Sequence, residues 1–223
     1  MSTTTSYPVI LFGSQATGLA DENSDQDYCV FCDNISFEEL AAVRRKTAIQ
    51  FQVTEDEVCV FTHQQLRRMA KKGSMFLRHL RDEGKIVAGD LGFAEKIYGN
   101  LSVFKDSQRE IETYRNILKD VRESNSDSLT DVAEFDLHLL QIVVRNTCVL
   151  ISYSFKATQY SRNGAYQFVL SVCPRIDFSL DDFQLVQHWH LVFSRGVAPE
   201  TRVPSPREVS DLLDRANLLL TFA

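Results

Sequence analysis

The sequence has little of what membrane-spanning or secreted proteins carry. Its longest apolar run, Leu137–Phe155, is interrupted by His138, Gln141, Arg145 and Asn146, and such side chains are costly inside a bilayer. The first residues lack the basic start and the long apolar core of a signal peptide. We therefore expect a soluble chain that makes no membrane contact and lies in the cytoplasm.

There is also no excess of positive charge. Lysine and arginine number 24 against 30 aspartates and glutamates, which gives a formal net charge of −6 over 223 residues. The surplus of acid is spread along the chain, with 14 acidic and 11 basic residues up to position 100 and 16 and 13 after it. The bulk charge gives no support for a dedicated nucleic-acid binder, although a local basic patch can still bind phosphate.

Cysteine is sparse and scattered. The chain has five cysteines, an odd number in apolar contexts, and only Cys29 and Cys32 form a C-x-x-C spacing. In a strand these two side chains point to opposite faces, and no second pair or nearby histidine completes a zinc site. We expect buried free thiols in a reducing compartment.

The chain divides into two parts with different sequence patterns. Up to about residue 104, the short apolar runs YPVILFG, DYCVF and VCVFT alternate with helical patterns, whereas from about residue 105 the pattern is helical throughout. A chain of this length can form one large domain or two small ones. We predict an α/β domain over 1–104 and an all-α bundle of four or five helices over 105–223, with a hinge near 99–107.

Helix starts are marked by serine or threonine followed three residues later by glutamate or glutamine. This spacing predicts capping boxes, in which the two residues satisfy each other's backbone N–H groups. The predicted boxes are Ser36 with Glu39, Thr62 with Gln65, Ser107 with Glu110, and Ser205 with Glu208.

Two carboxylates stand at the entrance of the second strand. Asp25 and Asp27 are two residues apart, so both project from the same face if the backbone is extended. Neighbouring carboxylates repel each other unless a cation lies between them, and Mg²⁺ prefers carboxylate and phosphate oxygens. Two such ions can activate an attacking oxygen and stabilise a leaving pyrophosphate.

Gly13 and Ser14 follow the first strand. A glycine there allows the backbone to approach a ligand closely, and Ser14 offers a hydroxyl and a backbone N–H. The following SQATGLADE segment is suited to a helix start, where free N–H groups favour an anion. The pattern predicts a phosphate cradle that faces a metal site across one crevice.

These residues resemble a known signature. The stretch GSQATGLADENSDQD, with Gly-Ser, ten residues and Asp-x-Asp, resembles that of the DNA polymerase β-type nucleotidyltransferase superfamily, and Gly18 and Ser24 also match its form. The order of parts resembles the minimal and kanamycin-type nucleotidyltransferases. The resemblance implies an α+β fold, with a small mixed-sheet nucleotidyltransferase domain followed by the bundle. It further implies that Ser14 binds the triphosphate within a nucleotide site of Gly13, Ser14 and Ser24.

The resemblance also implies that Asp25 and Asp27 are catalytic metal ligands and that a third carboxylate lies beside them. Glu57, which directly precedes the third apolar run, is our choice, with Asp56 and Glu55 as alternatives. The family position is more often aspartate. Because a glutamate is longer by one methylene, this departure puts the rate of reaction in question more than nucleotide binding.

The implied activity is Mg²⁺-dependent transfer of a nucleoside monophosphate, with two metal ions and ATP as the expected nucleotide. The acceptor is the hydroxyl of a protein, an RNA or a small molecule such as an aminoglycoside. An antitoxin that modifies its cognate toxin is one form of the first class. The competing hypothesis is a nucleotide-sensing or scaffold subunit whose site is weakened at Glu57. The bundle is expected to bind substrate or a partner, or to form a homo-oligomer.

One basic segment stands out within the first domain. Residues 67–85 carry seven lysines and arginines against Asp82 and Glu83, and Arg67 and Lys71 are four residues apart. This arrangement indicates either a solvated helix face or a basic patch that meets a polyphosphate or an acidic acceptor.

The helical half offers fewer functional candidates. It lacks a histidine four to six residues after Arg145, so RNA cleavage of the kind found in helical toxin ribonucleases is not predicted. Glu134 and Asp136 are either a general base or the acidic first turn of a helix. Packing and surface roles are expected for the consecutive residues His188, Trp189 and His190.

Overall fold

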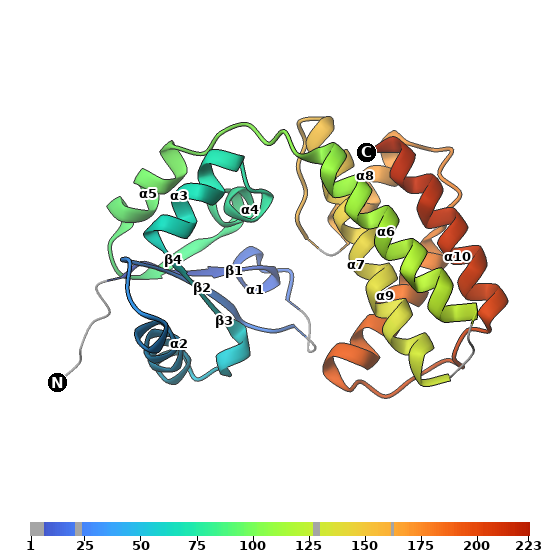
Figure 1. Ribbon diagram of the computed structural model, residues 1–223, viewed down its shortest axis with the longest axis horizontal. Coiled ribbons are helices and arrows are strands. Elements are labelled where there is room, and N and C mark those ends of the chain that lie inside the picture. Colours follow the sequence, from blue (N-terminus) through green and yellow to red (C-terminus); the bar gives the residue numbers. More distant parts are fainter. Residues whose placement is uncertain (1–6, 21–23, 127–129, 162) are drawn as a thin grey trace. The chain divides into compact units, whose positions relative to one another are not determined.

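The computed structural model describes residues 7–20, 24–126, 130–161 and 163–223 of the chain. It divides into two compact units, Met1–Lys105 and Asp106–Ala223. The first contains a small mixed sheet with helices, and the second is entirely helical in its described part. The fold is therefore α+β with a helical region, as the sequence predicted (Figure 1).

The sheet of the first unit has four strands in the order β3-β2-β1-β4. Strand β1 (Val9–Phe12) pairs antiparallel with β2 (Asp27–Cys32) and with β4 (Lys85–Ala88), whereas β2 pairs parallel with β3 (Val58–Thr62). The antiparallel pairing of β1 with β2 places the end of β1 beside the start of β2.

Helices cover both faces of this sheet. Helix α2 (Phe37–Phe51) packs on one face, where a cluster forms around Val9, Val30 and Val58. Helices α3 (His63–Lys72), α4 (Met75–Glu83) and α5 (Leu91–Gly99) pack on the other, around Ile10 and Phe31. Because side chains alternate along a strand, each strand contributes to both clusters. The remaining elements of this unit are the short helix α1 (Ser14–Thr17) and the 3₁₀ turn η1 (Glu55–Glu57).

Three of the four predicted capping boxes are formed. They begin α2 at Ser36, α3 at Thr62 and α10 at Ser205. The box predicted at Ser107 is wrong, because Ser107 is already helical and the N–H of Glu110 donates to the carbonyl of Asp106. Asp106 thus occupies the capping position. The serine at the next residue, which is already helical, made the sequence look as if the helix began one residue later.

The second unit consists of five helices followed by a 3₁₀ turn within the described residues. They are α6 (Ser107–Ser126), α7 (Thr130–Ser154), α8 (Gly164–Val172), α9 (Leu180–Arg195), α10 (Pro206–Leu219) and η2 (Leu220–Phe222). Helix α7 contacts α6, α8, α9 and α10, so it is the centre of the bundle. Part of it, Ala133–Ser154, is long and apolar enough to cross a membrane, but 67% of its apolar window is buried, as in the core helix of a soluble protein.

All five cysteines are free thiols. Cys29 lies in the cluster beneath α3 to α5, and burial raises the pKa of Cys32 to about 11. Burial disfavours the thiolate, which is the form that binds metals or attacks disulfides, and both thiols of this pair are free and buried as expected.

One pH effect is expected in the helical unit. The imidazoles of His138 on α7 and His190 on α9 stack with centroids 4.7 Å apart, and burial lowers the pKa of His138. Between that lowered pKa and the ordinary value of about 6.5, the unfolded chain binds more protons than the folded one. The free energy of unfolding should therefore fall as the pH drops below about 6.5.

Urea unfolding followed by circular dichroism at about pH 7.5 and pH 5.5 tests this expectation. The midpoint should be lower at the acidic pH, and His138→Gln should reduce the difference. The same pH dependence in the parent protein and in His138→Gln would contradict the assignment to His138.

Candidate active site

The first strand pair brings Gly13 to the second aspartate. Phe12 is the register partner of Asp27, so the residue after β1 lies beside the first residue of β2. Gly13 has a positive φ of 74°, and a Cβ placed on it would lie 3.2 Å from Oδ2 of Asp27. The glycine therefore meets both a conformational and a steric requirement, and the carboxylate of Asp27 lies against the Gly13 backbone.

Ser14 begins a single helical turn directly after that glycine. The carbonyl of Gly13 accepts the N–H groups of Ala16 and Thr17, and the carbonyl of Ser14 accepts the N–H of Leu19. These bonds hold the turn in place. Among the described residues no hydrogen bond is found for the Ser14 hydroxyl, so this group is available to a ligand at the same edge of the sheet as Asp27.

Asp25 and Asp27 differ in burial. Asp27 opens β2 and is half-buried, whereas Asp25 and the intervening Gln26 are exposed, and Ser24 before them is half-buried. By strand alternation Asp27 lies on the same face as Cys29 and so on the side of α3 to α5. The structure thus gathers Gly13, Ser14, Ser24, Asp25 and Asp27 at one end of the β1–β2 pair.

The carboxylate of Glu57 also reaches this segment. Its Oε1 accepts the backbone N–H of Gln26 at 3.2 Å, between the two aspartates. Its Oε2 accepts the N–H and the hydroxyl of Thr54, at 2.7 Å and 2.9 Å, and so caps η1. Its negative charge adds to burial in raising the pKa of Tyr28, which packs on the α2 face.

The two alternatives to Glu57 lie differently. Glu55 forms an exposed pair with Arg45 of α2 at 3.3 Å. Asp56 is exposed in η1. Within the described part of the chain, Glu57 is the member of this acidic run that hydrogen-bonds the Asp25–Asp27 segment.

The donor set suits a hard cation in part. Asp25 and Asp27 supply carboxylate oxygens, the ligands that Mg²⁺ prefers. The described residues contain no group of three or more histidine, cysteine, aspartate or glutamate side chains arranged around a metal position. Glu57 does not complete such a group, because its carboxylate oxygens accept hydrogen bonds from Thr54 and Gln26.

Other candidates from the sequence have different surroundings. Asp136 is 2% exposed on α7, where burial raises its pKa, so a substrate does not reach it as a general base. Trp189 is 1% exposed and His188 Nε2 accepts the N–H of Glu200, in agreement with packing and surface roles. In the basic segment, Arg78 donates to the carbonyls of Gly73 and Ser102, which ties α4 to the stretch after α5.

Comparison with known proteins gives one finding. A family model described as "Nucleotidyltransferase domain" matches residues 4–82, a range that runs from before β1 into α4 and includes both the Gly-Ser turn and the acidic residues. No curated protein matches the chain. The family match confirms the resemblance inferred from the Gly-Ser and Asp-x-Asp spacing.

Proposed function

Since residues 4–82 are a nucleotidyltransferase domain of the polymerase β-type superfamily, we propose that this enzyme transfers AMP from ATP to the hydroxyl group of an acceptor. The observation that carries the proposal is the contact between Gly13 and the carboxylate of Asp27. It brings a turn suited to phosphate and a carboxylate suited to metal to one edge of the sheet, as nucleotidyl transfer requires.

Each residue at this edge has a proposed role. The open backbone of Gly13 and the hydroxyl of Ser14 bind the triphosphate, with Ser24 beside them. Asp25 and Asp27 hold Mg²⁺, which, when bound, neutralises phosphate charge and lowers the pKa of an attacking hydroxyl. The protein contributes position and charge, since the carboxylates, the turn and the nucleotide must be held together before the acceptor arrives.

Glu57 is the proposed third carboxylate. Its bond to Gln26 N–H already holds the segment between the two aspartates, and each carboxylate oxygen has a further lone pair for a cation. The same bonds support a second candidate function. If Glu57 remains bound to Thr54, the domain binds nucleotide without efficient transfer, as a sensor or scaffold subunit would.

Glu57→Gln distinguishes these functions. The amide keeps an oxygen for Thr54 but removes the negative charge, so folding should be retained. For a third carboxylate we expect kcat to fall roughly 10²-fold with little change in nucleotide affinity, by analogy with the loss of one transition-state contact. The measurement is steady-state transfer of label from α-³²P-ATP.

Glu55→Gln is the matched control, since it removes the same charge two residues away at an exposed position. It should leave kcat within about twofold of the parent enzyme. If Glu57→Gln also leaves kcat unchanged, Glu57 only caps η1 and holds Gln26.

The acceptor is proposed to bind the helical unit, Asp106–Ala223, which lies outside the matched region. A protein acceptor would correspond to an antitoxin that modifies its cognate toxin. An RNA or a small hydroxylated molecule would use the same chemistry at the phosphate, because the attacking group is a hydroxyl in each case.

The test of the proposed function is a transfer reaction with each of the four α-³²P-labelled NTPs, with Mg²⁺ and cell lysate as the source of acceptor. Label should pass from ATP to one species in the presence of Mg²⁺ and not in EDTA. The size of that species identifies protein, RNA or small molecule. Absence of transfer together with ATP binding in calorimetry would favour the sensor function.

A further inference from the structure

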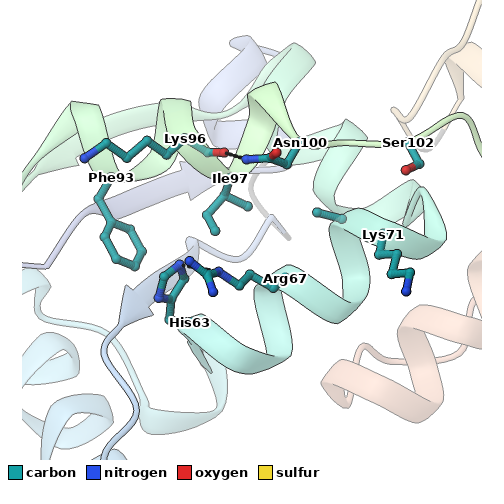
Figure 2. Close-up of a pocket in the computed structure, with 9 residues that line it drawn as sticks. His63, Arg67, Lys71, Phe93, Lys96, Ile97, Asn100 and Ser102 are labelled. Atoms are coloured by element: carbon teal, nitrogen blue, oxygen red, sulfur yellow. Dashed lines mark hydrogen bonds between the residues drawn. The ribbon is translucent and has the colours of Figure 1, made fainter.

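A groove lies between α3 and α5 (Figure 2). These two helices cover the face of the sheet opposite α2 (Figure 1). Its volume is about 680 Å³, and all of its lining residues lie between positions 63 and 102, within the first unit. None of them belongs to the set around Gly13 and Asp27. Ligand pockets commonly have volumes of about 300–1,000 Å³, so the groove has room for a small organic molecule.

Two helical stripes face each other across the groove. His63, Arg67 and Lys71 follow one another at four-residue intervals on α3, and Phe93 and Lys96 lie on one face of α5. Three- and four-residue spacing places side chains on the same helix face. Figure 2 shows Phe93 and Ile97 of α5 pointing toward His63 and Arg67 of α3, whereas Lys96 and Lys71 extend toward opposite ends of the groove.

The lining is basic and contains no acid. Arg67, Lys71 and Lys96 contribute three positive charges, and neither aspartate nor glutamate is among the lining residues. Within the described ranges no carboxylate pairs with these three side chains. The three cations therefore face solvent without local neutralisation, which favours an anionic ligand.

The guanidinium of Arg67 is oriented by a neighbour. Its Nε donates to Nε2 of His63 at 3.1 Å, and the two side chains lie together in Figure 2. The terminal N–H groups of the planar fork then remain for an acceptor, and such a fork matches the oxygens of a phosphate. This bond reduces the conformational freedom that Arg67 would otherwise lose on binding.

One end of the groove is apolar and aromatic. The ring of Phe93 lies 5.2 Å from that of His63, and Ile97, 3% exposed, lines the groove beside them. A flat aromatic face next to cations suits a ligand that has both a planar ring and phosphate groups.

We propose that the α3–α5 groove binds a nucleoside phosphate, with the base on Phe93 and the phosphates on Arg67 and Lys71. A small ligand is favoured over a nucleic acid, because the first hundred residues carry 14 acidic against 11 basic side chains and the positive charge is local to the groove. The groove also begins away from the edge of the sheet where Gly13 and Asp27 lie. Thr62, before His63, pairs with Cys32, five residues and about 16 Å along β2 from Asp27.

The proposal does not depend on nucleotidyl transfer, and its test avoids the Mg²⁺-dependent site. ADP is titrated into the full-length protein in EDTA and followed by calorimetry. We expect saturable binding that weakens as NaCl is raised. Arg67→Gln with Lys71→Gln should weaken ADP binding at least tenfold.

The matched control is Arg68→Gln with Lys72→Gln. These residues are exposed on the same helix with the same spacing but do not line the groove. This pair removes the same charge and should change ADP affinity less than threefold. Equal weakening by both pairs, or no binding at 5 mM ADP, would overturn the proposal.

Three further measurements locate the base, locate the site and distinguish a nucleotide from a nucleic acid. Phe93→Leu should weaken ADP binding and leave pyrophosphate binding unchanged, whereas equal affinity of the parent protein for both probes would overturn the role of the base. Asp25→Asn with Asp27→Asn should bind ADP in EDTA as the parent does. A loss in that variant would assign the ADP to the Gly13 edge instead. If a ten-nucleotide oligouridylate binds more tightly than ADP and displaces it, the groove binds nucleic acid and the proposal is overturned.

Discussion

Replacing both aspartates, Asp25→Asn with Asp27→Asn, should abolish Mg²⁺-dependent transfer while the protein remains folded. Asparagine has nearly the same shape as aspartate but no negative charge, so the variant should bind the cation much more weakly. A bound metal ion supplies several kcal/mol of transition-state stabilisation, which corresponds to a loss of roughly 10²–10⁴-fold in rate. The measurement is transfer of label from α-³²P-ATP, with circular dichroism as the check on folding.

Stability should not suffer in this variant, for a physical reason. Asp27 is half-buried and Asp25 is exposed, and asparagine fills nearly the same volume as aspartate, so neither substitution opens a cavity. The urea midpoint should therefore stay close to that of the parent.

The control variant is Asp33→Asn with Asp120→Asn. Both residues are exposed; Asp33 follows β2, at the opposite end of that strand from Asp27, and Asp120 lies on α6 in the helical unit. This pair changes the net charge by the same amount and should transfer label at the parent rate. Transfer at the parent rate by the Asp25 and Asp27 variant as well would refute the proposed active site.

The largest loss of stability is expected from Phe183→Ala in the helical unit. Phe183 is 2% exposed on α9, and its ring stacks on that of Tyr166 from α8 at 4.2 Å and 7°. Removing a buried phenyl group leaves a cavity and costs about 3–5 kcal/mol. Tyr166 would also lose its stacking partner, although its hydroxyl still donates to the carbonyl of Phe178.

Unfolding can be followed through a single reporter. Trp189, the one tryptophan of the chain, is 1% exposed on the same helix, so its fluorescence reports the bundle around α9. Phe193→Ala is the matched control, because Phe193 is 46% exposed on α9, and its loss should be about 1 kcal/mol or less. A similar urea midpoint for both variants would show that the stack does not stabilise the bundle.

Local sequence patterns were sufficient for three of the four helix starts that capping boxes predicted. The capping boxes at Ser36, Thr62 and Ser205 form as their spacing predicts, because both partners lie within four residues and the bonds need nothing from the rest of the fold. The Ser107 box failed because two adjacent residues, Asp106 and Ser107, can each cap a helix, and the spacing rule alone does not choose between them.

Some elements gave no clear signal. Strand β4 lies at the edge of the sheet and alternates between exposed and half-buried positions, and its four-residue sequence KIVA is too short for an apolar pattern to stand out. Helix α5 was likewise not anticipated. The groove between α3 and α5 therefore could not be predicted, although the four-residue spacing of Arg67 and Lys71 can be read from the sequence.

The sequence by itself determined the chemistry available to this protein: a Gly-Ser turn, two aspartates at the start of a strand, and a match of residues 4–82 to the nucleotidyltransferase domain family. Tertiary structure decided which groups meet. The antiparallel register of Phe12 with Asp27 puts Gly13 against a carboxylate, and the parallel pairing of β2 with β3 brings Glu57 to Gln26. The α3–α5 packing assembles the basic groove. Residue types and local spacing are properties of a short segment, whereas register and helix packing depend on burying both faces of the sheet at once.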